Sequence, residues 1–543
     1  MMRRLAACSI LTAGVLAGQT AIANAAVSGV VKDKVTGQPL ANYTVSTPVR
    51  GREKDVTSST DSSGRYKLMD LPPDAYRISA RSAQRSGFGQ ELARHVAVNG
   101  SDVENIDFLV LQPGTISGKV VDENKEPVPN VWVRLVQREY FLGNAGYYYA
   151  FPGGRTDDLG EFTITGIEPG HPYFLLADKV DFRLPAHSAA PLNPKLRKRV
   201  PVRTWYPAST FRESAEALTL QPGEKREGVD IEMNKSPSYC VAGTVFGPMG
   251  AAALHFSIEA MQPSSGQSSS GGTYMIAPSG TTAADGQFRI CDLYPGVYRL
   301  SAGDPVTSSP KSVHGSTDIT ITDQDLQGVR VNAGPGKSLE GEVVWDSDPP
   351  ATPVTNKVSV SVVPLFRIGY IGGRYDVPGT FTVDGVFPEE YEVQARFNAA
   401  GIYVKDVTFS DRSVRYEPLR PAAATNGSGL RVVMAHDGGT IAAQVNDKDG
   451  NPVADLFVLT IPAGTTSEGE LAARIQQGET DQAGQCTTPT LAPGKYYIVA
   501  IDRPIDRSPE TIGRLWRSRK RYREVDLPPA GSAQVRLEPG KIE

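Results

Sequence analysis

Residues 27–46 read VSGVVKDKVTGQPLANYTVS, and residues 60–80 read TDSSGRYKLMDLPPDAYRISA. Together they contain a strand built around a small residue, a polar turn, an Asp-x-x-Gly-aromatic turn, a proline-containing turn and a strand that carries a tyrosine. Asp-Gly and Pro-Gly pairs supply turn conformations that β-branched residues do not adopt. Short strands separated by such turns indicate a β-sandwich.

The same pattern returns four more times along the 543-residue chain. The small residue that opens each copy is Gly29, Gly118, Gly243, Gly341 or Ala443. The copies begin 89, 125, 98 and 102 residues apart. A segment of this length is enough for a whole sandwich, whereas solenoid repeats are shorter. We therefore predict an all-β protein of five tandem immunoglobulin-like or transthyretin-like sandwiches. Its short proline-containing links predict an elongated, semi-rigid rod.

The predicted domain boundaries follow these copies. Residues 508–521 are predicted to form a short helix, because Ser508-Pro509-Glu510 is a start signal and apolar residues follow at helical spacing. The predicted segments are a signal peptide at residues 1–25 and sandwiches at residues 26–113, 114–235 (with an aromatic hairpin insertion), 236–336, 337–436 (a degenerate copy) and 437–543.

The strings at residues 27–80 and 116–170 resemble the carboxypeptidase regulatory-like domain, here in tandem copies. The resemblance implies a seven-stranded, transthyretin-like β-sandwich of a kind often repeated in exported bacterial proteins. The family carries no catalytic residues of its own, so the resemblance implies none here. Its structural overlap with carbohydrate-binding folds suggests a ligand class by analogy only.

The N-terminus predicts export. Met1-Met2-Arg3-Arg4 precedes an apolar stretch that ends near Gly18, and Ala23-Asn24-Ala25 forms a cleavage site before Ala26. The mature chain contains no run of 18 consecutive apolar residues, so we expect no transmembrane segment in it. We predict a periplasmic, cell-surface or secreted protein. The net charge of −4 argues against a nucleic-acid partner.

Three cysteines follow the predicted signal peptide. Cys240 opens one strand pattern and Cys291 closes another in the same copy, so these two are the candidate disulfide. The alternative is two separate thiols, one or both of them buried. Cys486 has no evident partner in the sequence.

The sequence lacks the motifs of common catalytic sites. None of its six histidines lies within four residues of another, and no nucleophile elbow, P-loop or dinucleotide fingerprint is present. We therefore predict no catalytic residues, no metal site, no cofactor and no enzymatic activity.

Residues 140–154 read YFLGNAGYYYAFPGG. Consecutive residues of a strand face opposite sides, so these aromatic side chains cannot all enter one core. An exposed aromatic hairpin could stack on sugar rings or hold a protein; the alternative is packing on its own domain or a neighbour. The candidate ligand-binding residues are Tyr140, Tyr147, Tyr148 and Tyr149, joined by Trp205 and Tyr206 from a second aromatic segment.

Two basic stretches, residues 195–199 and 514–521, suit anionic lipid or polysaccharide, or an ordinary solvated surface. The sequence thus predicts an exported, non-catalytic binding or structural protein whose partner is a polysaccharide or an envelope protein, with carbohydrate binding as the most specific form. The alternatives are a protein–protein scaffold or accessory subunit of an envelope receptor or hydrolase, and a hydrolase with an unrecognised site. A cleft with several shifted pKa values would favour the hydrolase.

Overall fold

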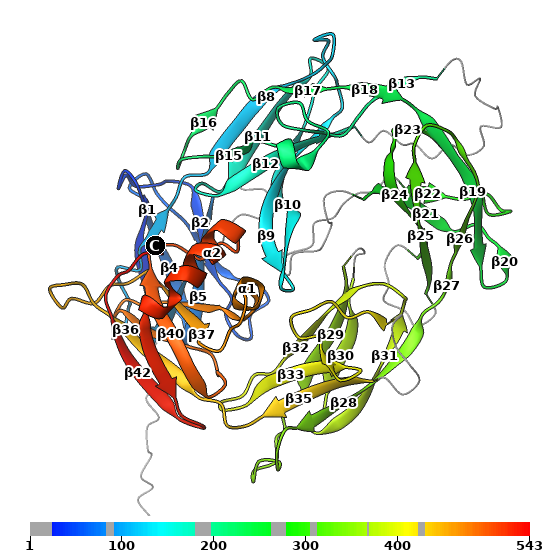
Figure 1. Ribbon diagram of the computed structural model, residues 1–543. Helices are drawn as coiled ribbons and strands as arrows, with labels where there is room; N and C mark the ends of the chain where they lie inside the picture. Colours follow the sequence, from blue (N-terminus) through cyan, green and yellow to red (C-terminus); the bar gives the residue numbers. More distant parts are fainter. Residues whose placement is uncertain are drawn as a thin grey trace, which may run out of the picture. The chain divides into compact units, whose positions relative to one another are not determined.

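The computed structural model describes residues 24–82, 92–179, 197–261, 279–304, 312–365, 369–421 and 429–542 (Figure 1). The predicted signal peptide, up to residue 23, lies outside the described residues, as do residues 195 and 196 of the first basic stretch. The chain divides into two compact units: Met1–Gln84 with Glu91–Val110, and Arg85–Gln90 with Leu111–Glu543. None of the helices in the described part of the chain has the length and apolar character that a membrane crossing needs.

The first unit is a sandwich of two sheets with strand orders β4-β1-β7 and β3-β2-β5-β6. Its buried side chains, from Ala25 to Val110, form one core between the sheets. The strands are β1 (Ala25–Asp33), β2 (Tyr43–Thr47), β3 (Val56–Ser59), β4 (Arg65–Leu71), β5 (Asp74–Ser82), β6 (Leu92–Val98) and β7 (Phe108–Val110).

The second sandwich opens the larger unit. Its sheets follow the orders β11-β8-β16, with β17 also on β8, and β10-β9-β12-β14, with β15 also on β12. The elements are β8 (Gly114–Asp122), β9 (Trp132–Phe141), β10 (Asn144–Arg155), β11 (Glu161–Ile167), β12 (Pro172–Asp178), β14 (Thr204–Trp205), the 3-10 helix η2 (Arg212–Ser214), β15 (Ala217–Thr219), β16 (Lys225–Arg226) and β17 (Ile231–Met233). A two-stranded ribbon of β13 (Arg199–Pro201) and β18 (Lys235–Pro237) leads to the third sandwich.

The third sandwich has the sheet orders β20-β19-β23, with β26 on β19, and β22-β21-β24-β25-β27. Its core takes in Val200 of β13 as well as residues of its own strands. The strands are β19 (Tyr239–Gly247), β20 (Gly250–Ala251), β21 (His255–Ala260), β22 (Ser279–Thr281), β23 (Gln287–Leu293), β24 (Gly296–Gly303), β25 (Val313–Ile321), β26 (Leu326–Asn332) and β27 (Gly334–Pro335).

The fourth sandwich has the orders β31-β28-β35-β33-β34 and β30-β29-β32 around its own core. Although its sequence motif is degenerate, it keeps two packed sheets. The strands are β28 (Lys337–Trp345), β29 (Val358–Pro364), β30 (Ile371–Tyr375), β31 (Gly379–Val386), β32 (Tyr391–Arg396), β33 (Tyr403–Phe409), β34 (Arg412–Ser413) and β35 (Leu430–Ala435).

The fifth sandwich has the orders β39-β36-β42 and β38-β37-β40-β41, and two helices pack on its outer face in a second apolar cluster. The sequence predicted the later helix but not the earlier one. The elements are β36 (Thr440–Val445), β37 (Phe457–Pro462), α1 (Glu468–Arg474), β38 (Gln476–Glu479), β39 (Gln485–Thr487), β40 (Gly494–Ile501), α2 (Pro509–Ser518), the 3-10 helix η4 (Arg519–Arg521), β41 (Arg523–Leu527) and β42 (Ser532–Leu537).

Close backbone approach explains the recurring glycine at the start of the copies. A Cβ on Gly29, Gly118 or Gly243 would lie 2.0, 2.1 or 2.0 Å from a backbone carbonyl oxygen of the neighbouring segment. No side chain fits that space, so these positions require glycine. The fifth copy carries Ala443, where β36 pairs with β42 in an unbroken parallel register that leaves room for a methyl group.

A tyrosine with a local hydrogen bond recurs as well. It follows the proline-containing turn, and its hydroxyl bonds to the backbone four or five residues upstream, which fixes the turn to the strand. The donors are Tyr76, Tyr173, Tyr298 and Tyr496, and the carbonyl acceptors are Pro72, Glu168, Tyr294 and Ala492. In the fourth sandwich the Tyr391 hydroxyl instead accepts from the Phe387 N–H at 2.7 Å.

The chain is thus all-β, with tandem sandwiches as predicted. The predicted domain boundaries stay a proposal, and so does the elongated rod.

A buried ion pair joins the second sandwich to the third. Asp178 is 1% exposed, and its Oδ2 accepts from Nε and Nη2 of Arg203 at 3.0 and 2.5 Å. Nη1 of Arg203 donates to the carbonyl oxygen of Ala260 in β21 at 3.3 Å. One guanidinium therefore binds both sandwiches.

Candidate functional site

The aromatic stretch forms a hairpin of β9 and β10, in which Tyr148 pairs with Gln137 and Tyr147 pairs with Arg138. Because side chains alternate along a strand, Tyr147 and Tyr149 share one face of the hairpin and Tyr148 lies on the other. The three consecutive tyrosines therefore have two different environments.

Tyr147 and Tyr149 pack on their own sandwich. Tyr147 makes edge contacts with Phe174 and Trp205, at ring-centroid distances of 5.4 and 6.1 Å. Tyr149 and Trp205 are buried in the same apolar cluster, and Trp205 is only 1% exposed. These residues therefore pack on their own domain, which was the alternative to an exposed aromatic platform. Tyr206 packs against the core of the second sandwich.

Tyr140 and Tyr148 instead line a pocket between the hairpin and the fifth sandwich. Tyr148 packs edge-on against Phe141, with ring centroids 5.8 Å apart. The hydroxyl of Tyr140 donates to Oε2 of Glu468 in α1 at 3.0 Å, and its backbone N–H donates to the carbonyl oxygen of Arg507 at 2.9 Å. Tyr140 thus links the hairpin to α1 and to the segment that precedes α2.

The tip of the hairpin meets α1 without any side chain between the two backbones. A Cβ on Gly469 would lie 2.0 Å from the carbonyl oxygen of Gly143. Local capping fixes the start of α1, because Ser467 accepts from the Glu470 N–H at 3.1 Å and Glu470 accepts from the Thr466 N–H at 2.7 Å. The contact therefore requires glycine at position 469.

Replacing Gly469 by alanine should separate the hairpin from α1. The lost Tyr140 N–H to Arg507 bond is expected to speed exchange of the Tyr140 amide by roughly fivefold to thirtyfold, as follows from a net loss of about 1–2 kcal/mol. Hydrogen exchange read by mass spectrometry on the peptide that contains Tyr140 measures this. Gly464→Ala is the matched control, because a Cβ there meets nothing within 4 Å. Unchanged exchange in Gly469→Ala would contradict the contact.

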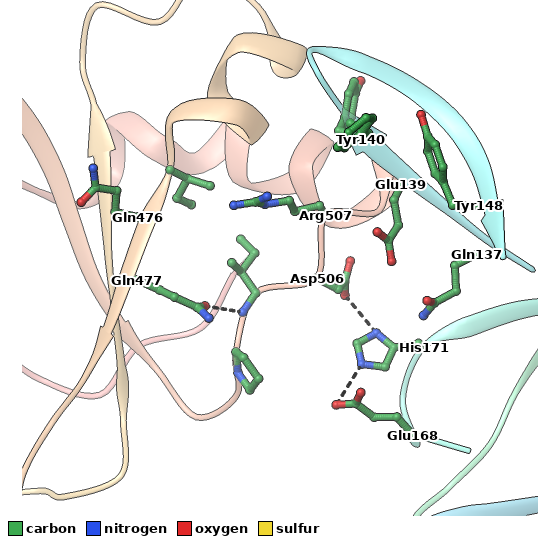
Figure 2. Close-up of a pocket in the computed structure, with 14 residues that line it drawn as sticks. Gln137, Glu139, Tyr140, Tyr148, Glu168, His171, Gln476, Gln477, Asp506 and Arg507 are labelled. Carbon is green, nitrogen blue, oxygen red and sulfur yellow. Dashed lines mark hydrogen bonds and ion pairs between the residues drawn. The ribbon is translucent and has the colours of Figure 1, made fainter. Parts of the chain in front are cut away.

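The pocket has a volume of about 540 Å³, within the range of small-molecule sites. Its lining combines aromatic rings, amides and ionisable groups from both sandwiches (Figure 2). The residues are Gln137, Glu139, Tyr140, Phe141, Tyr148, Glu168 and His171 from the second sandwich, and Ile475, Gln476, Gln477, Pro504, Ile505, Asp506 and Arg507 from the fifth.

His171 lies between carboxylates of both sandwiches. Its Nε2 is 3.6 Å from Oε1 of Glu168, and its Nδ1 is 3.8 Å from Oδ2 of Asp506 (Figure 2). Burial lowers the pKa of His171, but Glu168, Asp506 and Glu139 together outweigh it, so the pKa is raised above its ordinary value. A protonated His171 therefore strengthens the link between the two sandwiches.

Asp506 has a structural task at the start of α2. Its Oδ1 accepts from the Ser508 N–H at 2.9 Å and also from the Ser508 hydroxyl, and its Oδ2 accepts from the Thr511 hydroxyl at 2.9 Å. Ser508 in turn caps the helix by accepting from the Thr511 N–H. These donors hold the Asp506 carboxylate in place at the pocket wall.

Glu139 is the carboxylate that the pocket leaves without a donor: no described residue donates a hydrogen bond to it. Burial raises its pKa most, and Asp506 and, to a lesser extent, Glu168 raise it further, while His171 and Arg507 lower it. No group of three histidine, cysteine or acidic side chains in the described residues is arranged to hold a metal ion. The arrangement suits a polar organic ligand with a ring that can lie beside Tyr148.

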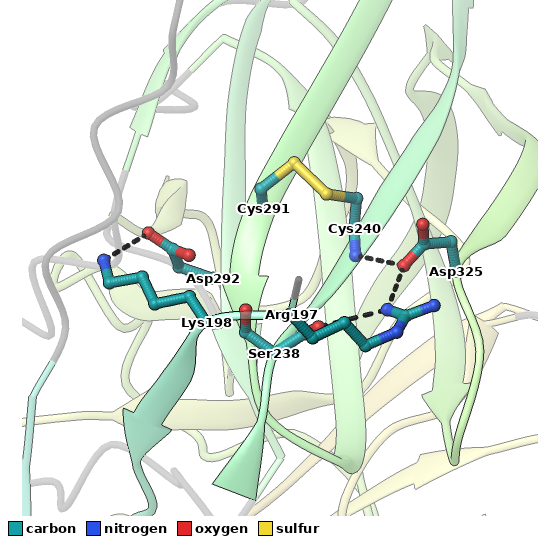
Figure 3. The surroundings of a disulfide bond; sticks show 7 residues. All are labelled: Arg197, Lys198, Ser238, Cys240, Cys291, Asp292 and Asp325. Atoms are coloured by element: carbon teal, nitrogen blue, oxygen red, sulfur yellow. Dashed lines mark hydrogen bonds and ion pairs between the residues drawn. A yellow bond between two sulfur atoms is a disulfide. The ribbon is translucent and has the colours of Figure 1, made fainter. Parts of the chain in front are cut away.

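The structure joins Cys240 and Cys291 by a disulfide (Figure 3). Oδ1 of Asp325 accepts from the Cys240 N–H at 3.0 Å and from Nη1 of Arg197 at 2.8 Å. Lys198 pairs with Asp292 at 2.9 Å. Two cations of the first basic stretch therefore serve ion pairs around the disulfide rather than a free anion-binding surface.

Cys486 is buried and unbridged. Burial raises the pKa of its thiol to about 11, so the reactive thiolate is scarce at neutral pH.

Sequence reasoning missed Glu139, Glu168, His171, Gln476, Gln477 and Asp506 as pocket residues. One local signal was available, since Ser467 and Glu470 have the spacing of a capping box and mark the start of α1. This signal would have predicted a helix in the fifth sandwich, but it would not have located the pocket.

The comparisons with known proteins bear on the first sandwich. Residues 26–111 match the model of the carboxypeptidase regulatory-like domain, which confirms the resemblance there. No curated protein matches the chain.

Several solved structures show slight likeness. The minor pilin of Streptococcus agalactiae is 14% identical, with 39% of this chain and 97% of the pilin covered and a TM-score of 0.22. Two B repeat units of the collagen-binding protein of Staphylococcus aureus are 11% identical, with 72% and 93% covered and a TM-score of 0.15. The major pilin subunit of Bacillus cereus is 10% identical, with 57% and 99% covered and a TM-score of 0.15. Likeness of this size carries no argument about what the chain binds.

Proposed function

We propose that the protein is an exported, non-catalytic binding protein that holds a carbohydrate in the pocket between the hairpin and the fifth sandwich. The observation that carries the proposal is the pocket's lining, which combines the rings of Phe141 and Tyr148 with the amides of Gln137 and Gln476. Aromatic rings pack against the apolar faces of sugars, and amides and carboxylates bond to their hydroxyls.

Two features support export. Residues 1–25 have the pattern of a signal peptide. The disulfide between Cys240 and Cys291 suits an oxidising compartment, because thiols in the cytosol are kept reduced.

Tyr148→Ala is expected to weaken saccharide binding by about tenfold or more, because it removes a ring contact worth about 0.5–1.5 kcal/mol beyond the apolar area it buries. The measurement is a panel of soluble and insoluble polysaccharides, with pull-down and tyrosine and tryptophan fluorescence on the full chain. Tyr370→Ala is the control, since this ring is 67% exposed and lies outside the pocket. Failure of every saccharide to bind would overturn the proposal and leave the protein–protein scaffold.

Glu139 favours a second candidate, a hydrolase. A carboxyl group of raised pKa beside another carboxylate is the pair that glycoside hydrolysis uses, and Glu139 lies near Asp506 in the pocket. Asp506, however, is engaged by Ser508 and Thr511, which favours a structural role for it. Release of reducing ends from a bound polysaccharide, abolished by Glu139→Gln, would replace the binding proposal with this one.

A further inference from the structure

The ionisable side chains make the pocket acidic. Its lining contains the carboxylates of Glu139, Glu168 and Asp506 against one guanidinium, that of Arg507, and the imidazole of His171. The balance is therefore −2 with His171 neutral and −1 with His171 protonated. A pocket of this sign repels anionic ligands and favours cationic ones.

Two of the three carboxylates are already engaged. Asp506 accepts from Ser508 and Thr511 at the start of α2, and Glu168 lies against His171. Figure 2 shows the guanidinium of Arg507 extending away from Glu139, towards Gln476.

Glu139 remains. It is half-buried on β9, and Figure 2 shows its carboxylate directed into the space above Asp506 and His171. A carboxylate removed from water without a donor is costly, and like charges nearby add to the cost. A ligand that places a cation against the Glu139 carboxylate removes that cost. The pocket therefore favours cationic ligands.

We infer that the pocket binds a saccharide that carries a protonated primary amine, with the Glu139 carboxylate receiving the ammonium group and the Tyr148 ring beside the sugar. The inference rests on the proposed function and narrows it to amino sugars. The amides of Gln137 and Gln476 are the neutral donors and acceptors for the remaining hydroxyls. A simple alkylamine would satisfy the charge but would leave the rings and amides unused.

The test is calorimetric titration of the full chain at pH 7 with two probes, the β-1,4-linked glucosamine disaccharide and its N-acetylated counterpart. The two share the rings and the linkage, and only the first has amines that can be protonated. We expect the amine form to bind about tenfold tighter or more, as a charge-assisted hydrogen bond implies. Glu139→Gln should remove this preference, so that the variant binds the two sugars with similar affinity. Glu538→Gln, an exposed acid outside the pocket, should change neither.

The outcomes separate this inference from the proposed function. Equal or tighter binding of the acetylated sugar by the wild-type chain overturns the inference and leaves carbohydrate binding in place. Binding of neither probe, nor of any saccharide in the panel, overturns both. Retention of the amine preference in Glu139→Gln also overturns the inference.

Folding of the variant does not limit the test. The pKa of Glu139 is raised in the folded chain, so ionising it costs stability as the pH rises through its titration, and removing the charge should leave the melting temperature at pH 7 equal or higher. Melting followed by circular dichroism checks this. The comparison of the two sugars on the wild-type chain decides the inference even without the variant.

Discussion

Arg203→Ala is expected to lower the free energy of unfolding by about 3–5 kcal/mol, because it leaves the buried Asp178 carboxylate without its cation. Among the described residues Oδ1 of Asp178 has no hydrogen-bond partner, so the side-chain hydrogen bonds of this carboxylate come from Arg203. The variant also loses the bond to the carbonyl oxygen of Ala260, which joins the second sandwich to the third. Urea unfolding followed by the fluorescence of Trp205, which is buried nearby in the same sandwich, measures the loss.

Two comparisons sharpen this prediction. Lys495→Ala removes an exposed ion pair with Glu524, which should cost less than about 1 kcal/mol. Replacing both Asp178 and Arg203 by leucine and methionine should be less harmful than Arg203→Ala alone, because no uncompensated charge stays behind. A loss below 1 kcal/mol for Arg203→Ala would contradict the buried pair.

Replacing Cys240 and Cys291 together by serine should cost about 4 kcal/mol, on the chain-entropy model for a bridge between cysteines 51 residues apart. The bridge restrains the unfolded chain, so its removal mainly favours the unfolded state. Thermal unfolding of the third sandwich within the full chain is the measurement.

Dithiothreitol provides the internal control for the disulfide. It should bring the wild-type protein down to the stability of the double variant and leave the variant unchanged. Equal stability of oxidised and reduced wild-type protein would show that the bridge does not contribute.

The fold was predictable because its signals are local. Asp61 accepts from the N–H groups of Ser63 and Arg65, and Asp157 accepts from those of Leu159 and Glu161, so each Asp-x-x-Gly turn is determined within five residues. The same turn begins at Asp481 in the fifth sandwich, where the carboxylate accepts from the N–H groups of Ala483 and Gln485. Such turns, together with the alternation of apolar and polar side chains along the strands between them, suffice to indicate a sandwich.

The pocket was not predictable in the same way. Alternation correctly implied that the tyrosines could not share one face, but which face meets a partner depends on residues far away in the chain. Tyr140 contacts Glu468 across 328 residues, and His171 faces Asp506. No local pattern connects such positions, so Glu139 and His171 carried no signal until the structure placed them beside the fifth sandwich.

The contact between the hairpin and α1 also has a mechanical consequence. Tyr140 and Glu468 pin together two points of the chain between which the third and fourth sandwiches lie. Tension applied between Leu111 and the C-terminal strand β42 therefore has a path through this contact that bypasses those two sandwiches. Once this contact ruptures, the chain between Tyr140 and Glu468 is released as slack and joins the load path.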